Sequence, residues 1–518
     1  MPNTFAYIML YCWPLVMLVM FRSMPLANAL CLSIIGGYLL LPGRAGMDLT
    51  LLPSLSKDSV PSMAALVMCL LLAQSDRLSE QLRGTAPGGR SAAARDAVQS
   101  VPLRGVPKGV VYGLLGLMLV FPALTVLNNS EALVYGPMVI GGMRAWDYGS
   151  VVQEVLVTLI PFVLGLWFLG TTQRHVVLLR TLVILGLGYS VLVAYEIRMS
   201  PQLNVKIYGF FPHSFAQHAR GDGFRPVVFL NHGLWLAIFM ATATLAACVL
   251  WRQALRARVA AAPWILAAVW LFLMLALSRS LGALVLVILV APIVLLTPPR
   301  TQILVAAVLA GLVLVFPMLR GAGYIPTDAL VQTAERIDPA RAQSLAFRFY
   351  HEDMLLEHAN RKPVTGWGTW SRNRVFNAET GRDISVTDGA WVIFMGQFGW
   401  VGYLARFGLL TLPIIFLALR RKDMLAPATT GLALVASAGL VDLIPNGTIT
   451  PLTWLVGGAL AGRYVRQERP VAASQTRGSR DPEADGAVLP APAQVHVRQT
   501  RGLALAGPAG PHQRQPRN

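Results

Sequence analysis

Thirteen apolar segments recur along the first 466 residues, and they constrain the fold more than any other feature. A helix of about 20 apolar residues crosses the hydrocarbon core of a bilayer. The segments lie at about 5–21, 24–41, 60–73, 109–127, 151–170, 177–195, 227–250, 263–277, 281–297, 302–318, 390–419, 426–444 and 451–466. Segment 60–73 is short for a span, whereas 390–419 can hold an interfacial piece and a span. The sequence therefore predicts an all-α polytopic membrane protein with about 12–13 transmembrane helices.

Composition supports a membrane protein and weakens the case for other classes. Of the 518 residues, 55% are hydrophobic and only 13% are charged, which lies outside the range of soluble globular proteins. The net charge of +18 would suggest a nucleic-acid partner in a soluble protein. Here the basic residues gather in short loops and in the C-terminal segment, so membrane orientation and anionic lipid head groups explain them better. No nucleic-acid partner is expected.

The four cysteines, Cys12, Cys31, Cys69 and Cys248, all lie inside apolar runs. Their spacing does not match that of metal ligands, and small buried hydrophobic side chains are the simplest interpretation. The sequence predicts no metal site and no cofactor. The first apolar run is followed closely by a second, so we expect a retained helix and not a cleavable signal peptide.

Lysine and arginine placement predicts the orientation of the helices. Basic residues concentrate in segment 74–108, at 252–258, at Arg300 and at 420–422. Counting helices places these four regions on one side, which the positive-inside rule assigns to the cytoplasm. The loops 42–59, 128–150, 196–226, 278–280 and 319–388 then face outward. We expect a transmembrane domain over 1–466 and a disordered, basic cytoplasmic tail over 467–518.

The largest outward loop, 319–388, is rich in ionisable and aromatic side chains. A connector this long is uncommon unless it has a function. The interval from Arg320 to Asp388 holds Arg336, Arg341, Arg348, His351, Glu352, Asp353, Glu357, His358, Arg361, Arg372 and Arg374, with Trp367, Trp370 and Trp391 nearby. The sequence predicts that this loop is the reactive face of a membrane enzyme.

Several arginines lie in the outward loops, where the positive-inside rule disfavours them. They are Arg198, Arg220, Arg225, Arg279 and Arg348. A guanidinium group binds phosphate oxygens with two parallel hydrogen bonds, so the group as a whole suggests an anionic partner. The alternative is that each arginine snorkels to the interface or pairs with Glu196, Asp222 or a carboxylate of the large loop.

Short motifs in this region resemble the O-antigen ligase and O-antigen polymerase superfamily. The turn Ser278-Arg279-Ser280, continued by Gly282-Ala283-Leu284, is similar to the family's S-R-S-x-G-A-L signature. The segments Ser344–Arg348 and Pro363–Trp370 resemble its "R … P-x-x-G-x-G" block, and Asp388–Tyr403 resembles its loop-to-helix junction. Arg220–Pro226 with Asn231-His232 falls where the family has an arginine-bearing external loop. The resemblance covers about residues 190–420.

The resemblance implies a GT-C-like, metal-independent membrane glycosyltransferase. Such an enzyme transfers a saccharide from undecaprenyl diphosphate to a hydroxyl of an acceptor glycan or glycolipid, at the periplasmic face of the bacterial inner membrane. Its partners would be the lipid-linked oligosaccharide, the acceptor, the bilayer and other proteins of polysaccharide assembly. The departing diphosphate needs preorganised cations. The arginines proposed for it are Arg198, Arg225, Arg279 and Arg348, with Arg220 in the same loop as Arg225.

The general base is less defined, because this chain has Asp388-Gly389 where the family usually has a histidine. Either Asp388 takes that role or His351 supplies it, and Asp388 is the slightly favoured candidate. The alternatives are that Asp388 caps the following helix and that His351 is a solvated surface residue. His232 lies close in sequence to Arg225 and could line the same site.

Trp367 and Trp370 could stack on sugar rings, although tryptophan is also common at membrane interfaces. Between the two activities of the superfamily, we favour a polymerase of an exopolysaccharide or O-antigen over a ligase. A lipid-linked oligosaccharide flippase or transporter is the alternative of a different class. Transporters usually carry ionisable residues at mid-membrane and repeated halves. The few charges inside the spans and the single dominant loop favour the enzyme.

Overall fold

The computed structural model describes residues 1–48, 53–83, 109–220, 223–369, 371–420, 425–447 and 449–466, without the side chains of 73–83, 220 and 341. They lie in the first of two units of the chain, Met1–Arg469. The expected cytoplasmic tail over 467–518 lies outside the described residues. So does 84–108, the greater part of the first basic region.

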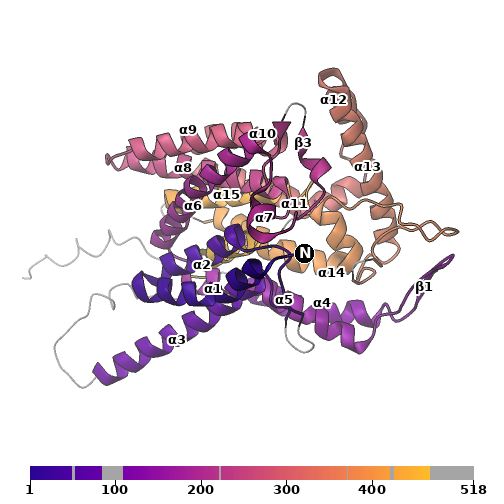
Figure 1. Ribbon diagram of the computed structural model, residues 1–518, viewed down its shortest axis with the longest axis horizontal. Coiled ribbons are helices and arrows are strands. Elements are labelled where there is room, and N and C mark those ends of the chain that lie inside the picture. The colour runs from indigo at the N-terminus through magenta and orange to yellow at the C-terminus, as the bar shows by residue number, and fades with distance from the viewer. Residues whose placement is uncertain are drawn as a thin grey trace, which may run out of the picture. The chain divides into compact units, whose positions relative to one another are not determined.

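Each of the thirteen apolar segments forms a helix, which confirms the all-α polytopic architecture (Figure 1). Among the described residues, seven helices are long and apolar enough to cross a membrane: α1 (Thr4–Ser23), α4 (Gly109–Leu127), α5 (Ala145–Phe168), α6 (Thr172–Met199), α8 (Gly233–Arg256), α11 (Pro299–Gly321) and α14 (Ala390–Ala418). The others are α2 (Leu26–Leu40), α3 (Ser59–Arg83), α9 (Ala262–Leu277), α10 (Leu281–Leu296), α15 (Pro427–Asp442) and α16 (Pro451–Val465).

Helices α5 and α16 approach each other closely at their backbones. A side chain at Gly458 or Gly462 would overlap the backbone of Phe162 or Leu166 on α5. Close approach through small residues is the usual way that membrane helices gain van der Waals contact, because lipid offers no hydrophobic driving force between them. The glycines of α16 therefore allow the backbones of these two helices to pack in direct contact.

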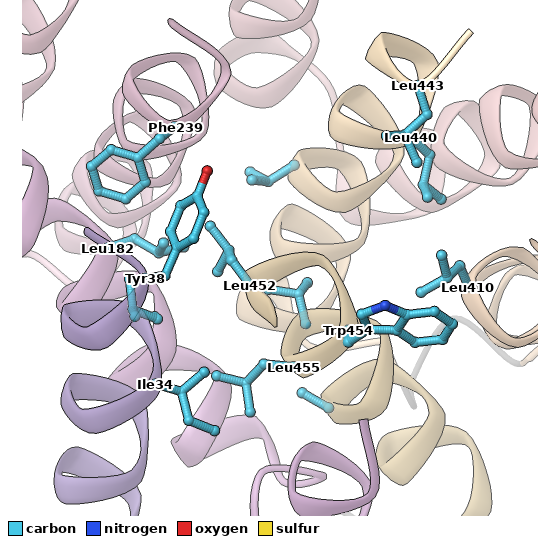
Figure 2. Close-up of a cluster of buried hydrophobic side chains, with 14 of the residues drawn as sticks. Ile34, Tyr38, Leu182, Phe239, Leu410, Leu440, Leu443, Leu452, Trp454 and Leu455 are labelled. Carbon is cyan, nitrogen blue, oxygen red and sulfur yellow. The ribbon is translucent and has the colours of Figure 1, made fainter. Parts of the chain in front are cut away.

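The centre of the bundle is a cluster of buried apolar side chains (Figure 2). Trp454 and Leu455 of α16 are 2% and 0% exposed. The labelled neighbours in Figure 2 come from α2, α6, α8, α14 and α15: Ile34, Tyr38, Leu182, Phe239, Leu410 and Leu440. Helices from both ends of the chain thus share one core.

Helix α14 is broken at Gly399, whose φ of 59° and ψ of −161° are not helical. The prediction that 390–419 holds a short piece and a span agrees with this break. The break leaves some main-chain amides and carbonyls of α14 without a helical partner, and segment 363–368 forms hydrogen bonds with them. The four hydrogen bonds run from the amides of Trp367 to Gly396 (2.8 Å), Gly368 to Gln397 (2.8 Å), Trp400 to Pro363 (2.8 Å) and Val401 to Val364 (3.2 Å).

The interval 319–388, which the sequence presented as a loop, is helical over about half its length. It contains α12 (Thr327–Ile337) and α13 (Pro339–Asn360), and Figure 1 shows these two helices at the right, beyond the membrane-spanning bundle. Two small hairpins complete the described elements: β1 (Leu133–Tyr135) with β2 (Met138–Ile140), and β3 (Ala219–Arg220) with β4 (Gly223–Phe224). Two short helices precede the second hairpin, α7 (Leu203–Tyr208) and the 3-10 helix η2 (Phe215–His218).

Candidate active site

Two of the predicted arginines, Arg225 and Arg279, lie in contact. Arg279 occupies the turn between α9 and α10 with a left-handed φ of 56°. Nη2 of Arg225 donates a hydrogen bond to the carbonyl oxygen of Arg279 over 3.4 Å. A side chain at Gly223 would place its Cβ 2.7 Å from Nη2 of Arg279, so this glycine leaves the space that the guanidinium occupies. The guanidinium of Arg225 therefore lies against the main chain of the turn that carries Arg279, and the guanidinium of Arg279 lies beside Gly223.

The side chain of Glu196, near the end of α6, holds the loop that carries Arg225. The carboxylate accepts hydrogen bonds from the main-chain amides of Val227 (2.8 Å), Val228 (2.7 Å) and Leu203 (3.0 Å). Val228 has a φ of 55°, which costs free energy for a β-branched residue. The sequence offered Glu196 as an ion-pair partner for an arginine. In the structure its oxygens bind main-chain amides and fix the strained loop.

His232 lies beside the same loop, at the start of α8. Its Nδ1 accepts from the amide of Leu234 (3.0 Å) and so caps α8. Its ring centre is 5.0 Å from that of His218 and 5.1 Å from that of His213. The carbonyl of His218 accepts from the amide of Arg225 (2.8 Å). No group of three residues with metal-ligand geometry occurs in the described part of the chain.

A second group forms around Arg348 of α13 and Asp388. Nε of Arg348 lies 3.3 Å from a carboxylate oxygen of Asp388, and the two side chains are 34% and 35% exposed. The residue that caps α14 is Gly389, without a side-chain hydrogen bond. The alternative that Asp388 is a helix cap is therefore not what the structure shows, because its carboxylate faces the arginine.

Glu352 and Arg320 lie next to this ion pair and were not singled out from the sequence. Arg320 ends α11, 8% exposed, and pairs with Asp353 at 2.6 Å. Glu352 lies one helical turn after Arg348, with its carboxylate 3.9 Å from Nε of Arg320. Burial raises the pKa of Glu352 to about 7. The four-residue spacing places Arg348 and Glu352 on one face of α13, but it is burial that distinguishes Glu352 from the other carboxylates of the interval.

His351 is buried, not solvated. It is 7% exposed and packs against Phe347 and Tyr350, with ring-centre distances of 4.3 and 5.4 Å. Its Nδ1 is enclosed and has no hydrogen-bond partner among the described residues. Because consecutive helical residues point about 100° apart, His351 and Glu352 present their polar groups to different surroundings.

The remaining predicted residues differ in their placement. Trp367 stacks on His358, with centres 4.3 Å apart and planes at 9°, and its indole nitrogen donates to the His358 carbonyl (2.8 Å). Lys362 lies 4.8 Å from the Trp367 ring centre, so this tryptophan is engaged within the protein. Arg198 is exposed in the last turn of α6. Trp370 and the side chain of Arg220 lie outside the described residues.

Arg372 has a structural role that could not be predicted from its being an arginine in a polar interval. It is 2% exposed, and its guanidinium donates to the carbonyls of Trp367 (2.9 Å), Glu131 (3.1 Å) and Gly141 (2.9 Å). Glu131 also pairs with Lys362. Arg372 therefore fastens the hairpin segment 131–141 to the segment that follows Pro363.

A small cavity of about 60 Å³ lies between α2, α8, α14, α15 and α16. Its walls are mostly apolar and include Tyr38, Phe239, Leu410, Leu440 and Leu452, which Figure 2 shows. Asp442 lies at the end of α15 and lines it too, accepting a hydrogen bond from Asn446 (3.0 Å).

Comparison with known families gives one match. Residues 264–407 match the family model described as O-antigen ligase. This range contains Arg279, Arg348, Glu352, Asp388 and the break at Gly399. The comparison with curated proteins found no match.

Proposed function

The chain belongs to the family of O-antigen ligases and polymerases, and we propose that it transfers a saccharide from undecaprenyl diphosphate to an acceptor sugar hydroxyl. The reaction takes place at the periplasmic face of the bacterial inner membrane. The ends of α6, α9 and α11 and the starts of α8, α10 and α14 fall on one side if each helix crosses once. Both arginine groups belong to that side, which supports a shared outward site.

The observation that carries this proposal is the contact between Arg225 and Arg279. Glu196 fixes the loop that carries Arg225, and Gly223 leaves room for the guanidinium of Arg279. In this proposal the two guanidinium groups, which come from separate loops, form a preorganised cationic surface. Such a surface stabilises the negative charge that develops on a diphosphate as the anomeric C–O bond breaks. Arg348, Arg198 and Arg220 are further candidates for diphosphate binding in this proposal, and His232 lines the Arg225 side of it.

On the acceptor side, we propose that Asp388 and His351 help to bind and position the acceptor saccharide. Asp388 holds Arg348 in position through their ion pair. His351 carries an enclosed nitrogen without a partner among the described residues, which a bound sugar hydroxyl could satisfy. Trp370 is the proposed sugar-stacking residue. Trp367 would need to exchange its contact with His358 or Lys362 for one with a sugar.

The cations for the departing diphosphate are arginines in this proposal, so the reaction needs no bound metal. The test is glycan synthesis by isolated membranes in the presence of a chelator such as EDTA. We expect synthesis to continue at an unchanged rate. A loss of synthesis that magnesium restores would overturn metal independence while leaving the transferase activity in place.

We favour a polymerase that joins carrier-linked repeat units of an exopolysaccharide or O-antigen. A ligase that transfers the finished glycan to the lipid A core is the second candidate, because the matched family model is described as O-antigen ligase. The two reactions share the donor and differ only in the acceptor.

Deletion of the gene, followed by separation of the cell's glycans by size, tests the proposal. Single repeat units without long chains would establish a polymerase. Long chains left on the carrier, with a bare lipid core, would establish a ligase. Repeat units trapped on the cytoplasmic side would establish a flippase, and an unchanged glycan profile would overturn all three functions.

A further inference from the structure

We propose that Glu352 is the group that takes the proton from the acceptor hydroxyl, an assignment that rests on the transferase function proposed above. The sequence directed attention to Asp388 and His351 instead. The assignment follows from what the side chains of Glu352 and Asp388 contact.

Glu352 is a buried carboxylate whose hydrogen-bonding capacity is unused in the described part of the chain. Its side chain is 8% exposed, and its ion-pair contact is the 3.9 Å approach to Nε of Arg320. That distance is too long for a hydrogen bond. Arg320 directs its Nη2 to Asp353 at 2.6 Å instead. A carboxylate buried without donors can accept a hydrogen bond from a substrate hydroxyl.

Asp388 is differently placed. Its oxygen is 3.3 Å from Nε of Arg348 and the pair is about one-third exposed. A carboxylate that is neutralised by a guanidinium is a poor proton acceptor, because protonation would abolish the ion pair. Asp388 then serves to position Arg348, one helical turn before Glu352 on the same face of α13. This geometry places a phosphate-binding cation and a proton acceptor side by side.

The charges around Glu352 suit a base that works near neutral pH. Burial raises its pKa to about 7, Arg320 and Arg348 oppose this rise, and Asp353 and Asp388 reinforce it. These four groups come from α11, from α13 and from the segment before α14. A base is most effective when its pKa lies close to the working pH, because it is then both available and strong enough.

In the proposed step one bond forms and one bond breaks at the anomeric carbon. The acceptor oxygen forms a bond to the anomeric carbon while the bond from that carbon to the diphosphate oxygen breaks. The electron pair of the broken bond stays on the diphosphate, next to the arginines. The hydroxyl proton moves to the Glu352 carboxylate, which later releases it to solvent.

The test compares Glu352→Gln, Glu352→Asp and Glu357→Gln in the full-length protein, expressed in the gene-deletion strain. Glu357 is the matched control, because it lies on the same helix in an exposed pair with Arg361. The reaction is measured in isolated membranes without added substrate, between pH 5.5 and 8.5. The signal is glycan chain growth, or glycan transfer, from the strain's own lipid-linked pool. Immunoblots and thermal unfolding report the amount and folding of each variant.

We expect Glu352→Gln to slow glycan transfer by at least about 100-fold, the usual contribution of general acid–base catalysis. The wild-type rate should rise with pH to half its maximum at about 7, and the residual rate of Glu352→Gln should lack this rise. Glu352→Asp should retain the rise at reduced rate, and Glu357→Gln should match the wild type.

A folded Glu352→Gln protein within about threefold of the wild-type rate, with the same pH dependence, would overturn the assignment. An Asp388→Asn variant that loses the pH-dependent rise while Glu352→Gln keeps it would transfer the role to Asp388. If the wild-type gene itself fails to change the glycans of the deletion strain, the transferase function falls and this assignment falls with it. The wild-type complementation therefore separates the two failures.

Discussion

The guanidinium of Arg225 donates its hydrogen bond to the main-chain carbonyl of Arg279, 3.4 Å away. One arginine thus supports the turn that presents the other. The two residues are 54 positions apart in the sequence and belong to different loops, so neither loop forms the cationic surface alone. Loss of the Arg225 side chain should therefore also disturb the turn that presents Arg279.

Arg279→Ala should reduce glycan synthesis by at least about 100-fold, because removing one preorganised donor from a charge-stabilising site typically has this effect. Arg279→Lys should recover only part of the rate, since an ammonium cannot bind two phosphate oxygens as a fork. The measurement is glycan chain length in the complemented deletion strain.

The matched control is Arg258→Ala. Arg258 also has a left-handed φ, 53°, in the turn between α8 and α9. If each helix crosses the membrane once, that turn lies on the other side of the membrane from Arg279. We expect normal glycans from Arg258→Ala. Normal glycans from Arg279→Ala would instead remove the diphosphate-binding role of Arg279.

Glu196→Gln should loosen the loop that carries Arg225, because an amide offers one acceptor oxygen where the carboxylate serves three main-chain amides. Hydrogen bonds to a charged acceptor contribute about 1.5–3 kcal/mol each. We expect lower glycan synthesis and faster amide hydrogen exchange at 226–230. Unchanged exchange in this segment would show that the strained Val228 is held by its packing alone.

Gly366→Ala should destabilise the protein by more than about 3 kcal/mol. Gly366 has a φ of 67°, and a Cβ there would overlap the backbone of Gln397 and Phe398. Gly323→Ala is the control: its φ is 73° but no atom lies within 4 Å of the added Cβ, so it should cost only about 1–2 kcal/mol. Thermal unfolding in detergent should show the larger shift for Gly366→Ala, and equal shifts would contradict the close-approach argument.

Arg372→Met should cost about 3 kcal/mol, because several buried carbonyl oxygens lose a charged donor. Arg361→Met, which breaks an exposed pair within α13, should change stability by less than about 0.5 kcal/mol. Limited proteolysis should cleave the Arg372 variant first near 131–141 or 371–388. Equal resistance of both variants would mean that Arg372 does not fasten these segments.

Acid should weaken the packing around His358. Burial lowers the pKa of His358, helped by the charge of Arg361, although the hydrogen bond to the Arg372 carbonyl opposes this. The folded state therefore binds the proton less readily than the unfolded chain, so this contribution is present above the unfolded pKa of about 6.5 and is lost as the pH falls. The hydrogen-exchange protection factors near the end of α13, which are corrected for the intrinsic pH dependence of exchange, should fall from pH 7.5 to pH 5. His358→Gln should abolish that fall, and a fall that persists would assign it to another group.

The helical architecture followed from the sequence because apolar runs of span length have few alternatives in a bilayer. Even the interruption of 390–419 was foreseeable from its length. The helices α12 and α13 were not, because their polar residues and short apolar repeats resemble those of a connecting loop. α12 buries no side chain at all, so its sequence carries little signal of packing.

The candidate site was only partly accessible from the sequence. Arg225, Arg279 and His232 could be grouped because they lie in outward loops near each other in the predicted topology. Arg372 and Glu352 could not be separated from the other charges of the interval, because one is distinguished by carbonyl contacts from another loop and the other by burial. Both properties arise from tertiary structure.

The four hydrogen bonds that join 363–368 to the broken part of α14 also restrict how this chain can change in evolution. Residues 369–387 can gain or lose length without altering those bonds, since both paired segments keep their own internal spacing. An insertion of one residue inside 363–368 or 396–401 would shift the pairing and leave freed amides of the break unpaired. Sequences of this type should therefore vary in length between the two segments and be free of insertions within them.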